Sequence, residues 1–327
     1  MKPDVQRHEF DADLLAEIEK ISANDNYHAL IAIAADYGVI AAAIAAKVAF
    51  GWVVYPLCVL VIGSRQRALA TIVHEASHNA LARNKVLSLI LATLFSGYLI
   101  FSTFHAYKAS HVVGHHGNFG HPELDGDYRF MLEKGIYDIK DEKRFAWEIL
   151  IKPFLLANVP SYLAYLAKHR LLSTRNNAAR LENVLLIALW SVIISVALAF
   201  GQGFNLVLFW IVPLLTSFQI IGWFIELAEH GPLMQTGLNL HMTRNRHSHW
   251  LEHFFTGMHG ENYHLAHHLR PRVPFWRMKA LHEILMGDSA YREWDSRCGG
   301  IFLSSNNAPS VVSILMNQCR QRMVLDM

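Results

Sequence analysis

The strongest constraint on the fold is an almost uninterrupted apolar stretch over residues 29–63. Within it only Asp36 and Lys47 carry a charge. A single membrane crossing needs about 20 apolar residues, so this stretch is too long for one crossing. Two helices joined by a turn, over 29–48 and 51–69, fit its length. The sequence therefore predicts a transmembrane hairpin near the N-terminus.

A second pair of apolar segments, 183–200 and 205–225, is joined by the turn sequence GQGF. Two further apolar segments, 86–104 and 148–166, are interrupted by glycine, proline or polar residues. We interpret these two as interfacial or half-buried helices, with additional crossings as the alternative. The predicted fold is an all-α integral membrane protein. It has four transmembrane helices in two hairpins, interfacial helices and a cytosolic histidine-rich cap.

Composition supports a membrane protein and argues against several other classes. Hydrophobic residues make up 53% of the 327-residue chain and charged residues 17%, against about a quarter charged in an ordinary soluble domain. A net charge of +2 gives no reason to expect nucleic-acid binding. Three cysteines without paired spacing cannot form a disulfide framework. The polar first 20 residues do not resemble a secretory signal.

The distribution of basic residues predicts the orientation of the four crossings. Lysine and arginine precede the first crossing, follow the second and precede the third, whereas the opposite loops at 49–51 and 201–204 are uncharged. Both termini and the loops on their side are therefore expected in the cytoplasm, most simply across a bacterial inner membrane. The expected divisions are a cytosolic N-terminal segment (1–28), a membrane domain (29–290) and a C-terminal cytosolic tail (291–327).

Histidine is the second informative feature of the sequence. The chain has 20 histidines, and the segments HEASH, HVVGHH and HLAHH hold eight of them in three compact groups. Residues three or four apart share a face of a helix, and neutral imidazole is the commonest protein ligand for transition metals. The groups therefore predict a metal centre on the cytoplasmic side. Its candidate ligands are His74, His78, His111, His115, His116, His264, His267 and His268.

The spacings H-x3-H, H-x3-HH and H-x2-HH, in this order around two hairpins, resemble the three histidine boxes of the membrane fatty acid desaturase and hydroxylase superfamily. The resemblance extends to AEHG (228–231), TRN (243–245) and the run MHGENYHLAHHLRPRVPFWRMKALHEIL (258–285). It covers about residues 25–290. It implies that the boxed histidines hold two iron ions at the cytoplasmic ends of the helices, with O2 as co-substrate.

The resemblance also implies a ninth ligand, His230 in the AEHG segment. Eight imidazoles would leave four for each iron, and a ninth would bring one iron to five while leaving room for O2. Histidine ligands also need partners that orient their rings, and Glu226 is a candidate for contacting the metal itself. The candidate partners are Glu75, Asp125, Asp127, Glu226, Glu229, Glu252 and Asn262.

The implied activity is O2-dependent desaturation of a fatty acyl chain. A hydroxylase of a lipid, alkane or carotenoid is the alternative, because both reactions begin with hydrogen abstraction. No segment resembles cytochrome b5 or ferredoxin, so electrons are expected from a separate carrier such as ferredoxin. The acyl group can arrive on a membrane lipid, an acyl-carrier protein or coenzyme A. The basic residues that are candidates for contacting a phosphate, an acidic partner or lipid headgroups are Arg170, Arg175, Arg180, Arg244 and Arg246.

Two other metalloprotein classes remain as alternatives. HEASH also fits H-E-x-x-H, the pattern in which two histidines bind zinc and the glutamate acts as general base. An intramembrane zinc protease could take a third ligand from LDG at 124–126, but this interpretation leaves six boxed histidines unexplained. A metal transporter should carry ligands within its crossings, and these crossings hold almost none.

Overall fold

The computed structural model describes residues 5–138, 141–157, 159–171 and 177–325. In these described ranges the chain is helical without strands, apart from isolated bridges at Gln6–Leu238 and Ser305–Ala308, which confirms the predicted all-α class. The extremities of the predicted terminal segments and residue 158 of the segment 148–166 lie outside these ranges. The chain forms two compact units. Unit 1 comprises Met1–Ala23, His111–Asn158 and Trp223–Met327, and unit 2 comprises Asn24–Ser110 and Val159–Gly222.

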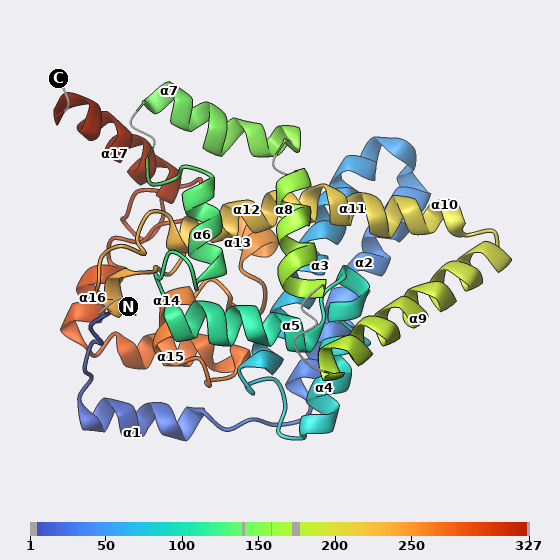
Figure 1. The fold of residues 1–327 in the computed structure, drawn as a ribbon, viewed down its shortest axis with the longest axis horizontal. Helices are drawn as coiled ribbons and strands as arrows, with labels where there is room; N and C mark the ends of the chain where they lie inside the picture. Colours follow the sequence, from blue (N-terminus) through green and yellow to red (C-terminus); the bar gives the residue numbers. More distant parts are fainter. Residues whose placement is uncertain (1–4, 139–140, 158, 172–176, 326–327) are drawn as a thin grey trace. The chain divides into compact units, whose positions relative to one another are not determined.

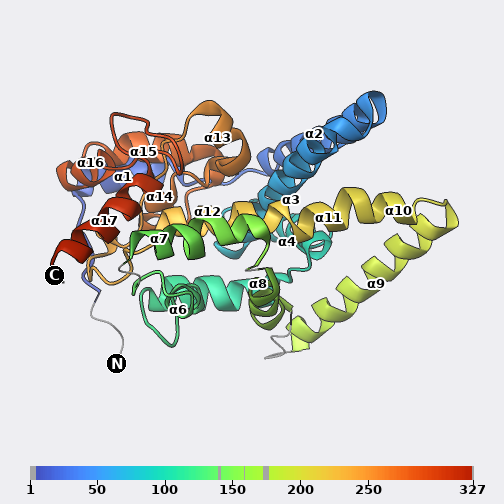
Figure 2. The same ribbon diagram turned by 90° about the horizontal axis from the view of Figure 1, so that it is seen from above.

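Unit 2 contains the first predicted hairpin. Helices α2 (His28–Phe50) and α3 (Tyr55–Ser77) are joined by a turn in which Gly51 has a φ of +78°. The Arg65 guanidinium lies 3.4 Å from the Asp36 carboxylate, so α3 runs back along α2 (Figure 2). The same contact gives the carboxylate in this apolar helix a cationic partner, which lowers the cost of placing it there.

The second predicted hairpin is also helical, but its outgoing arm is interrupted. The chain turns after α9 at Gly201, where φ is +66°. The following segment is not one α-helix, because Pro213 lacks an N–H and Thr216 leaves the helical region with a φ of −121°. Its successive elements are α9 (Asn177–Ala199), α10 (Gly203–Leu206), a π-helical turn (Val207–Ile211), α11 (Val212–Leu215) and α12 (Ser217–His230).

Three helical runs among the described residues are long and apolar enough to cross a membrane, or up to five if each of two bent helix pairs is one span. The three runs are His28–Ser77, which is the folded-back pair α2 and α3, Asn177–Ala199 and Gly203–His230. Helix α9 leaves large apolar side chains such as Ile187 and Leu198 exposed, as expected of a surface that faces lipid.

The two segments predicted as interfacial are broken. The chain adopts left-handed φ angles at Phe101 (+57°) and Leu156 (+60°), which end the helical turns before them. The remaining helices of unit 2 are α4 (Lys85–Thr93), α5 (Phe104–Lys108) and α8 (Val159–Leu166).

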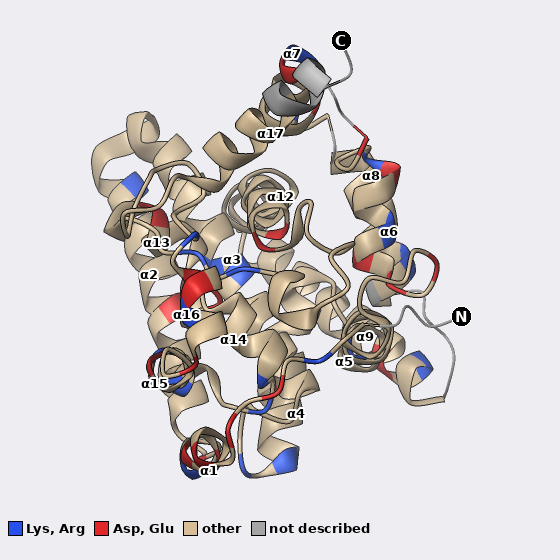
Figure 3. Cartoon of the chain, turned by 90° about the vertical axis from the view of Figure 1, so that its left-hand side faces the viewer, with Lys and Arg blue, Asp and Glu red and all other residues tan. Residues whose placement is uncertain are grey.

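Unit 1 is built from short helices around a common core (Figure 1). Ile18, Leu265, Leu281 and Leu285 form one buried apolar cluster, so the N-terminal helix and the helix of the third histidine box share a core. Acidic and basic residues cover the outer sides of α1 and α15 (Figure 3). The helices are α1 (Ala12–Ile21), α6 (Gly126–Glu133), α7 (Glu142–Phe145), α13 (Trp250–Thr256), α14 (His264–Leu269), α15 (Met278–Leu285), α16 (Ser289–Asp295) and α17 (Val311–Leu325).

Candidate metal centre

The third histidine box lies on α14, as its spacing predicts. His264 begins this helix, and the ring centroids of His264 and His268 lie 4.6 Å apart. His264 and His267 are buried, and His268 is half-buried. One short helix thus presents three imidazoles within a compact volume.

The second box lies on a π-helical turn, Ala109–His115, and on the residue that follows it. The ring centroid of His111 lies 5.4 Å from that of His115 and 4.8 Å from that of His116. Both His111 and His115 are buried. Single turns of π-helix occur frequently at functional sites. All three rings belong to unit 1, together with those of the third box.

The imidazole Nε2 atoms of unit 1 converge. A metal–nitrogen bond of about 2.0–2.1 Å places two ligands at right angles about 2.9 Å apart. The observed Nε2–Nε2 separations are close to this value, so the rings fit ligands that share an ion. They are 2.8 Å for His230 and His264, 3.1 Å for His264 and His268, 3.3 Å for His115 and His268, and 3.3 Å for His116 and His267.

Carboxylates lie beside the opposite ring nitrogens of several of these histidines. The Nδ1 atom of His115 lies 3.0 Å from Asp125 Oδ1, and that of His264 lies 3.3 Å from Glu229 Oε2. A carboxylate that accepts the Nδ1 proton fixes the tautomer in which the Nε2 lone pair can bind a metal. Asp127 is a further nearby carboxylate, with Oδ2 at 3.7 Å from Nδ1 of His115.

Asp125 and Glu229 are themselves held in place. Asp125 is fully buried and accepts hydrogen bonds from the backbone N–H groups of Gly120, Asp127 and Tyr128. Glu229 is buried against Arg246, whose Nη2 lies 2.8 Å from its Oε1. Both carboxylates can therefore orient a ring without moving.

The first histidine box lies in unit 2. His74 is in the last turn of α3 and His78 caps this helix, with the two ring centroids 4.9 Å apart. The Nδ1 atom of His74 lies 3.0 Å from Glu75 Oε1, so Glu75 is placed to orient that ring. The box has the same pattern of paired rings and adjacent carboxylate as the boxes of unit 1.

Three further predicted partners are Glu226, Asn262 and Glu252. Glu226 is half-buried one turn before His230. The backbone carbonyl of Asn262 accepts a hydrogen bond from the N–H of Arg246 at 2.8 Å. Glu252 accepts hydrogen bonds from the N–H groups of Ile301 and Phe302. Asn262 and Glu252 thus fasten backbone segments in this structure.

The expectation that Arg244 and Arg246 meet a phosphate or lipid headgroups is wrong. Their exposed fractions are 4% and 0%, so neither can reach such a partner. Arg244 Nη2 donates to the carbonyl of Gly231 at 2.7 Å, and Arg246 pairs with Glu229. These arginines instead attach residues 244–246 to the end of α12.

Sequence reasoning missed the role of Asn245. Its Oδ1 accepts the N–H groups of Leu265 (3.0 Å) and Ala266 (3.3 Å), which caps the first turn of α14 from a distant part of the chain. Its amide nitrogen donates to Asp295 Oδ1 at 2.7 Å and to the Tyr291 hydroxyl at 2.8 Å. The only signal in the sequence was the TRN segment, which does not reveal these long-range contacts.

Substitution of Asn245 by alanine is expected to loosen the helix that carries the third box. The buried groups left without partners should lower the free energy of unfolding by about 1–3 kcal/mol. Displacement of the histidine rings on α14 should weaken iron binding about tenfold. Loss of a residue that orients a metal ligand typically lowers metal affinity by about 10- to 100-fold, and this value is at the lower end of that range. Thermal unfolding and iron content of the purified protein measure the two effects.

Asn84 provides the matched control. Its side chain caps α4 through the N–H groups of Val86 and Leu87, but α4 carries no histidine. Asn84→Ala should lower stability by about 0.5–2 kcal/mol and leave iron content unchanged. Equal iron loss in both variants would show that general destabilisation, not the position of α14, controls metal binding.

Other histidines have different partners. His247 Nε2 lies 3.0 Å from Asp295 Oδ2, and His105 Nδ1 lies 2.7 Å from Glu182 Oε2. Within the cluster, burial and then the nearby His116 ring lower the pKa of His268 well below its ordinary value. His268 therefore stays neutral at physiological pH, the form that binds a metal.

The chain thus combines apolar helices long enough to cross a membrane with groups of convergent histidines that could hold a metal ion. The chain belongs to the fatty acid desaturase family, whose family model, described as "Fatty acid desaturase", matches residues 50–296. It is therefore an oxidoreductase of the desaturase type. The family and the apolar helices together indicate an integral membrane protein.

Two relatives give further detail. Over 304 residues the chain is 39% identical to dihydrorhizobitoxine desaturase of Bradyrhizobium elkanii, covering 91% of this chain and 86% of the relative. Over 123 residues it is 29% identical to the chloroplastic sn-2 acyl-lipid omega-3 desaturase (ferredoxin) of Arabidopsis thaliana, covering 37% of this chain and 27% of the relative. Membership of this family favours the histidine-box interpretation of HEASH over the zinc protease.

Proposed function

We propose that the chain is a di-iron, O2-dependent desaturase that introduces a double bond into a fatty acyl chain. The observation that carries this proposal is the convergence of the Nε2 atoms of the second and third boxes with that of His230. Imidazole suits iron and withstands oxidising conditions under which a thiolate ligand would be oxidised. No cysteine belongs to any of the candidate metal-binding groups among the described residues.

The proposed iron ligands are His74, His78, His111, His115, His116, His230, His264, His267 and His268. Iron, when bound, supplies the oxygen chemistry that removes hydrogen from an unactivated carbon. The residues around it orient the rings and limit access of water. Phe119 contributes an apolar surface, because its ring stacks on His268 with centroids 4.6 Å apart. Asp125 and Glu229 hold the rings of His115 and His264 from behind.

The source of electrons is proposed to be a separate carrier. The printed name of the Arabidopsis relative includes ferredoxin, which supports a donor of that type. The fatty acyl chain can be carried by a membrane lipid, an acyl-carrier protein or coenzyme A. A substrate outside the fatty acyl class is the second candidate, because the Bradyrhizobium relative is named for dihydrorhizobitoxine. A pocket beside His116 and His268, lined by Arg7 and Arg270, favours this second candidate.

We further propose that four crossings place both termini and all three boxes in the cytoplasm. The apolar runs and the uncharged turn at 201–204 support this topology. Cysteine introduced at the exposed Gln202 should react with a membrane-impermeant reagent added outside the cell, and cysteine at the exposed Glu123 should not. The native cysteines in the structure are buried and give little background. The reverse labelling pattern would contradict the proposed orientation.

The proposed activity is tested by expression in a host with defined lipids. Purified protein should contain two irons per chain, and mass spectrometry of the host's acyl groups should find products lighter by two hydrogens. Inactive protein with the boxed histidines replaced is the control for host enzymes. A product gaining one oxygen would indicate the hydroxylase instead. Stoichiometric zinc without iron would contradict the di-iron proposal.

A further inference from the structure

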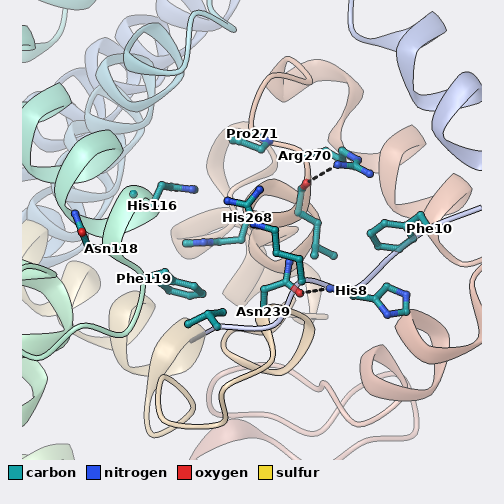
Figure 4. Close-up of a pocket in the computed structure, with 13 residues that line it drawn as sticks. His8, Phe10, His116, Asn118, Phe119, Asn239, His268, Arg270 and Pro271 are labelled. Atoms are coloured by element: carbon teal, nitrogen blue, oxygen red, sulfur yellow. Dashed lines mark hydrogen bonds between the residues drawn. The ribbon is translucent and has the colours of Figure 1, made fainter. Parts of the chain in front are cut away.

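A pocket of about 450 Å³ opens in unit 1 beside His116 and His268. This volume lies in the range of about 300–1,000 Å³ that is usual for sites of small molecules. Its walls come from the N-terminal segment 5–10, residues 116–119, Asn239 and residues 268–271. His116, His268 and Phe119 lie on one side, and Phe10, His8 and Arg270 lie on the other (Figure 4). The pocket thus extends from two proposed metal ligands to the side chains of His8 and Arg270.

The N-terminal wall of the pocket is fixed by hydrogen bonds. The N–H of Gln6 donates to the carbonyl of Gly237 at 2.9 Å, and the N–H of Asn239 donates to the carbonyl of Gln6 at 3.0 Å. The N–H of His8 donates to Asn239 Oδ1 at 2.8 Å. Phe10 packs against the apolar core of unit 1. These contacts hold Arg7 and its neighbours at the edge of the pocket.

The charge of the pocket is unbalanced. Arg7 and Arg270 both line it, and its lining residues include no Asp or Glu. In the part of the chain that the structure describes, neither guanidinium forms an ion pair. Arg270 lies over the ring of Phe10, 5.3 Å from its centroid. His8 differs, because its Nε2 lies 3.1 Å from Asp288.

We propose that Arg7 and Arg270 bind a carboxylate or phosphate group of the substrate, with the rest of the substrate extending toward His116 and His268. The proposal rests on the proposed function, because it assumes that these histidines hold the reactive centre. A guanidinium can bind either oxyanion through two parallel hydrogen bonds. Phe10, Phe119 and Leu269 offer apolar surface for the body of such a molecule.

This arrangement selects a class of substrate. The anionic group and the carbon to be oxidised would occupy one cavity, so the substrate is a small molecule with its own charge near the reacting position. An acyl chain esterified in a membrane lipid has no free carboxylate, and the phosphate of a phospholipid is separated from the acyl carbons by the glycerol unit and the ester. The pocket therefore favours a free carboxylic acid or a phosphate ester over an acyl lipid.

Calorimetric titration of the iron-loaded protein in a neutral maltoside detergent tests the pocket. The three probes are octanoate, octyl phosphate and octanol, which differ only in their head group. We expect one of the two anions to bind at least tenfold more tightly than octanol, and the better of them identifies the oxyanion. Arg270→Gln and Arg7→Gln should each weaken that binding at least tenfold, because each removes a charged donor. Arg7 is exposed, so its replacement should leave the fold intact.

Arg272→Gln is the matched control, because Arg272 is exposed on the same loop but does not line the pocket. It should bind the anion as the unchanged protein does. Binding that is equally strong for octanol, absent for all three probes, unchanged in the Arg7 and Arg270 variants, or equally weakened by Arg272→Gln would overturn the proposal.

Different experimental results would contradict the proposed anion site and the proposed di-iron function. A protein that binds the anion through Arg270 but holds no iron would contradict the di-iron function and leave the pocket supported. A protein that holds two irons and desaturates a substrate, but binds the anion equally well after Arg7 or Arg270 is replaced, would contradict only the proposed anion site. Iron content measured on each variant separates the two results.

Discussion

Replacement of His267 or His111 by alanine is expected to remove iron from the purified protein and to abolish turnover. The Nε2 atom of His267 lies 3.3 Å from that of His116, and the His111 ring is buried beside those of His115 and His116. Loss of a residue that orients a metal ligand typically lowers metal affinity by about 10- to 100-fold. Loss of a ligand itself should therefore lower iron affinity by at least about 100-fold. Iron analysis and acyl-product mass spectrometry measure the two losses.

The fold should survive these substitutions, since the cost of one buried side chain is about 0.5–3 kcal/mol. His121→Ala is the matched control. His121 follows the second box, but its Nδ1 accepts the N–H groups of Glu123 and Leu124, and it belongs to none of the candidate metal-binding groups. This variant should keep its iron. Full iron occupancy in both His111→Ala and His267→Ala would remove these two histidines from the proposed ligand set.

Apolar length and turn residues were sufficient to predict the helical class and the two turns at which the apolar helices are joined. The turn at Gly51 and the turn at Gly201 both occur where the sequence places them. The interruption of the second outgoing arm was less predictable. Its proline was visible, but the break at Thr216 arises from a backbone conformation that hydrophobicity does not report.

The histidines could be grouped from spacing alone, because neighbours on one turn remain neighbours in the folded chain. Contacts between distant segments could not be predicted in this way. Arg246 was a candidate for contacting a phosphate, an acidic partner or lipid headgroups, yet it is fully buried against Glu229, 17 positions earlier. Asn245 reaches both α14 and Asp295, 50 positions later. Such partners are set by tertiary packing, so a single sequence gives no periodic signal for them.

His230 is the position at which sequence and geometry support the same proposal by independent routes. The sequence suggests a ninth ligand from the AEHG segment. In the structure, His230 ends α12 and its Nε2 lies 2.8 Å from that of His264. Its ring centroid also lies 4.8 Å from that of His115 and 5.0 Å from that of His268. One side chain therefore lies between the second and third boxes.

His230→Ala is accordingly expected to abolish turnover and to lower iron content by about one ion per chain, because the remaining rings leave one metal with too few ligands. Metal binding should fall at least about 100-fold, as for a boxed histidine. Iron stoichiometry by mass spectrometry, combined with acyl-product analysis, measures this effect. His241→Ala is the control, since His241 lies in the following loop, half-buried against Trp294 with ring centroids 4.6 Å apart. If His230→Ala retained two irons and normal turnover as His241→Ala should, His230 would serve only to end α12. The iron set would then consist of the eight boxed histidines, with four imidazoles for each metal.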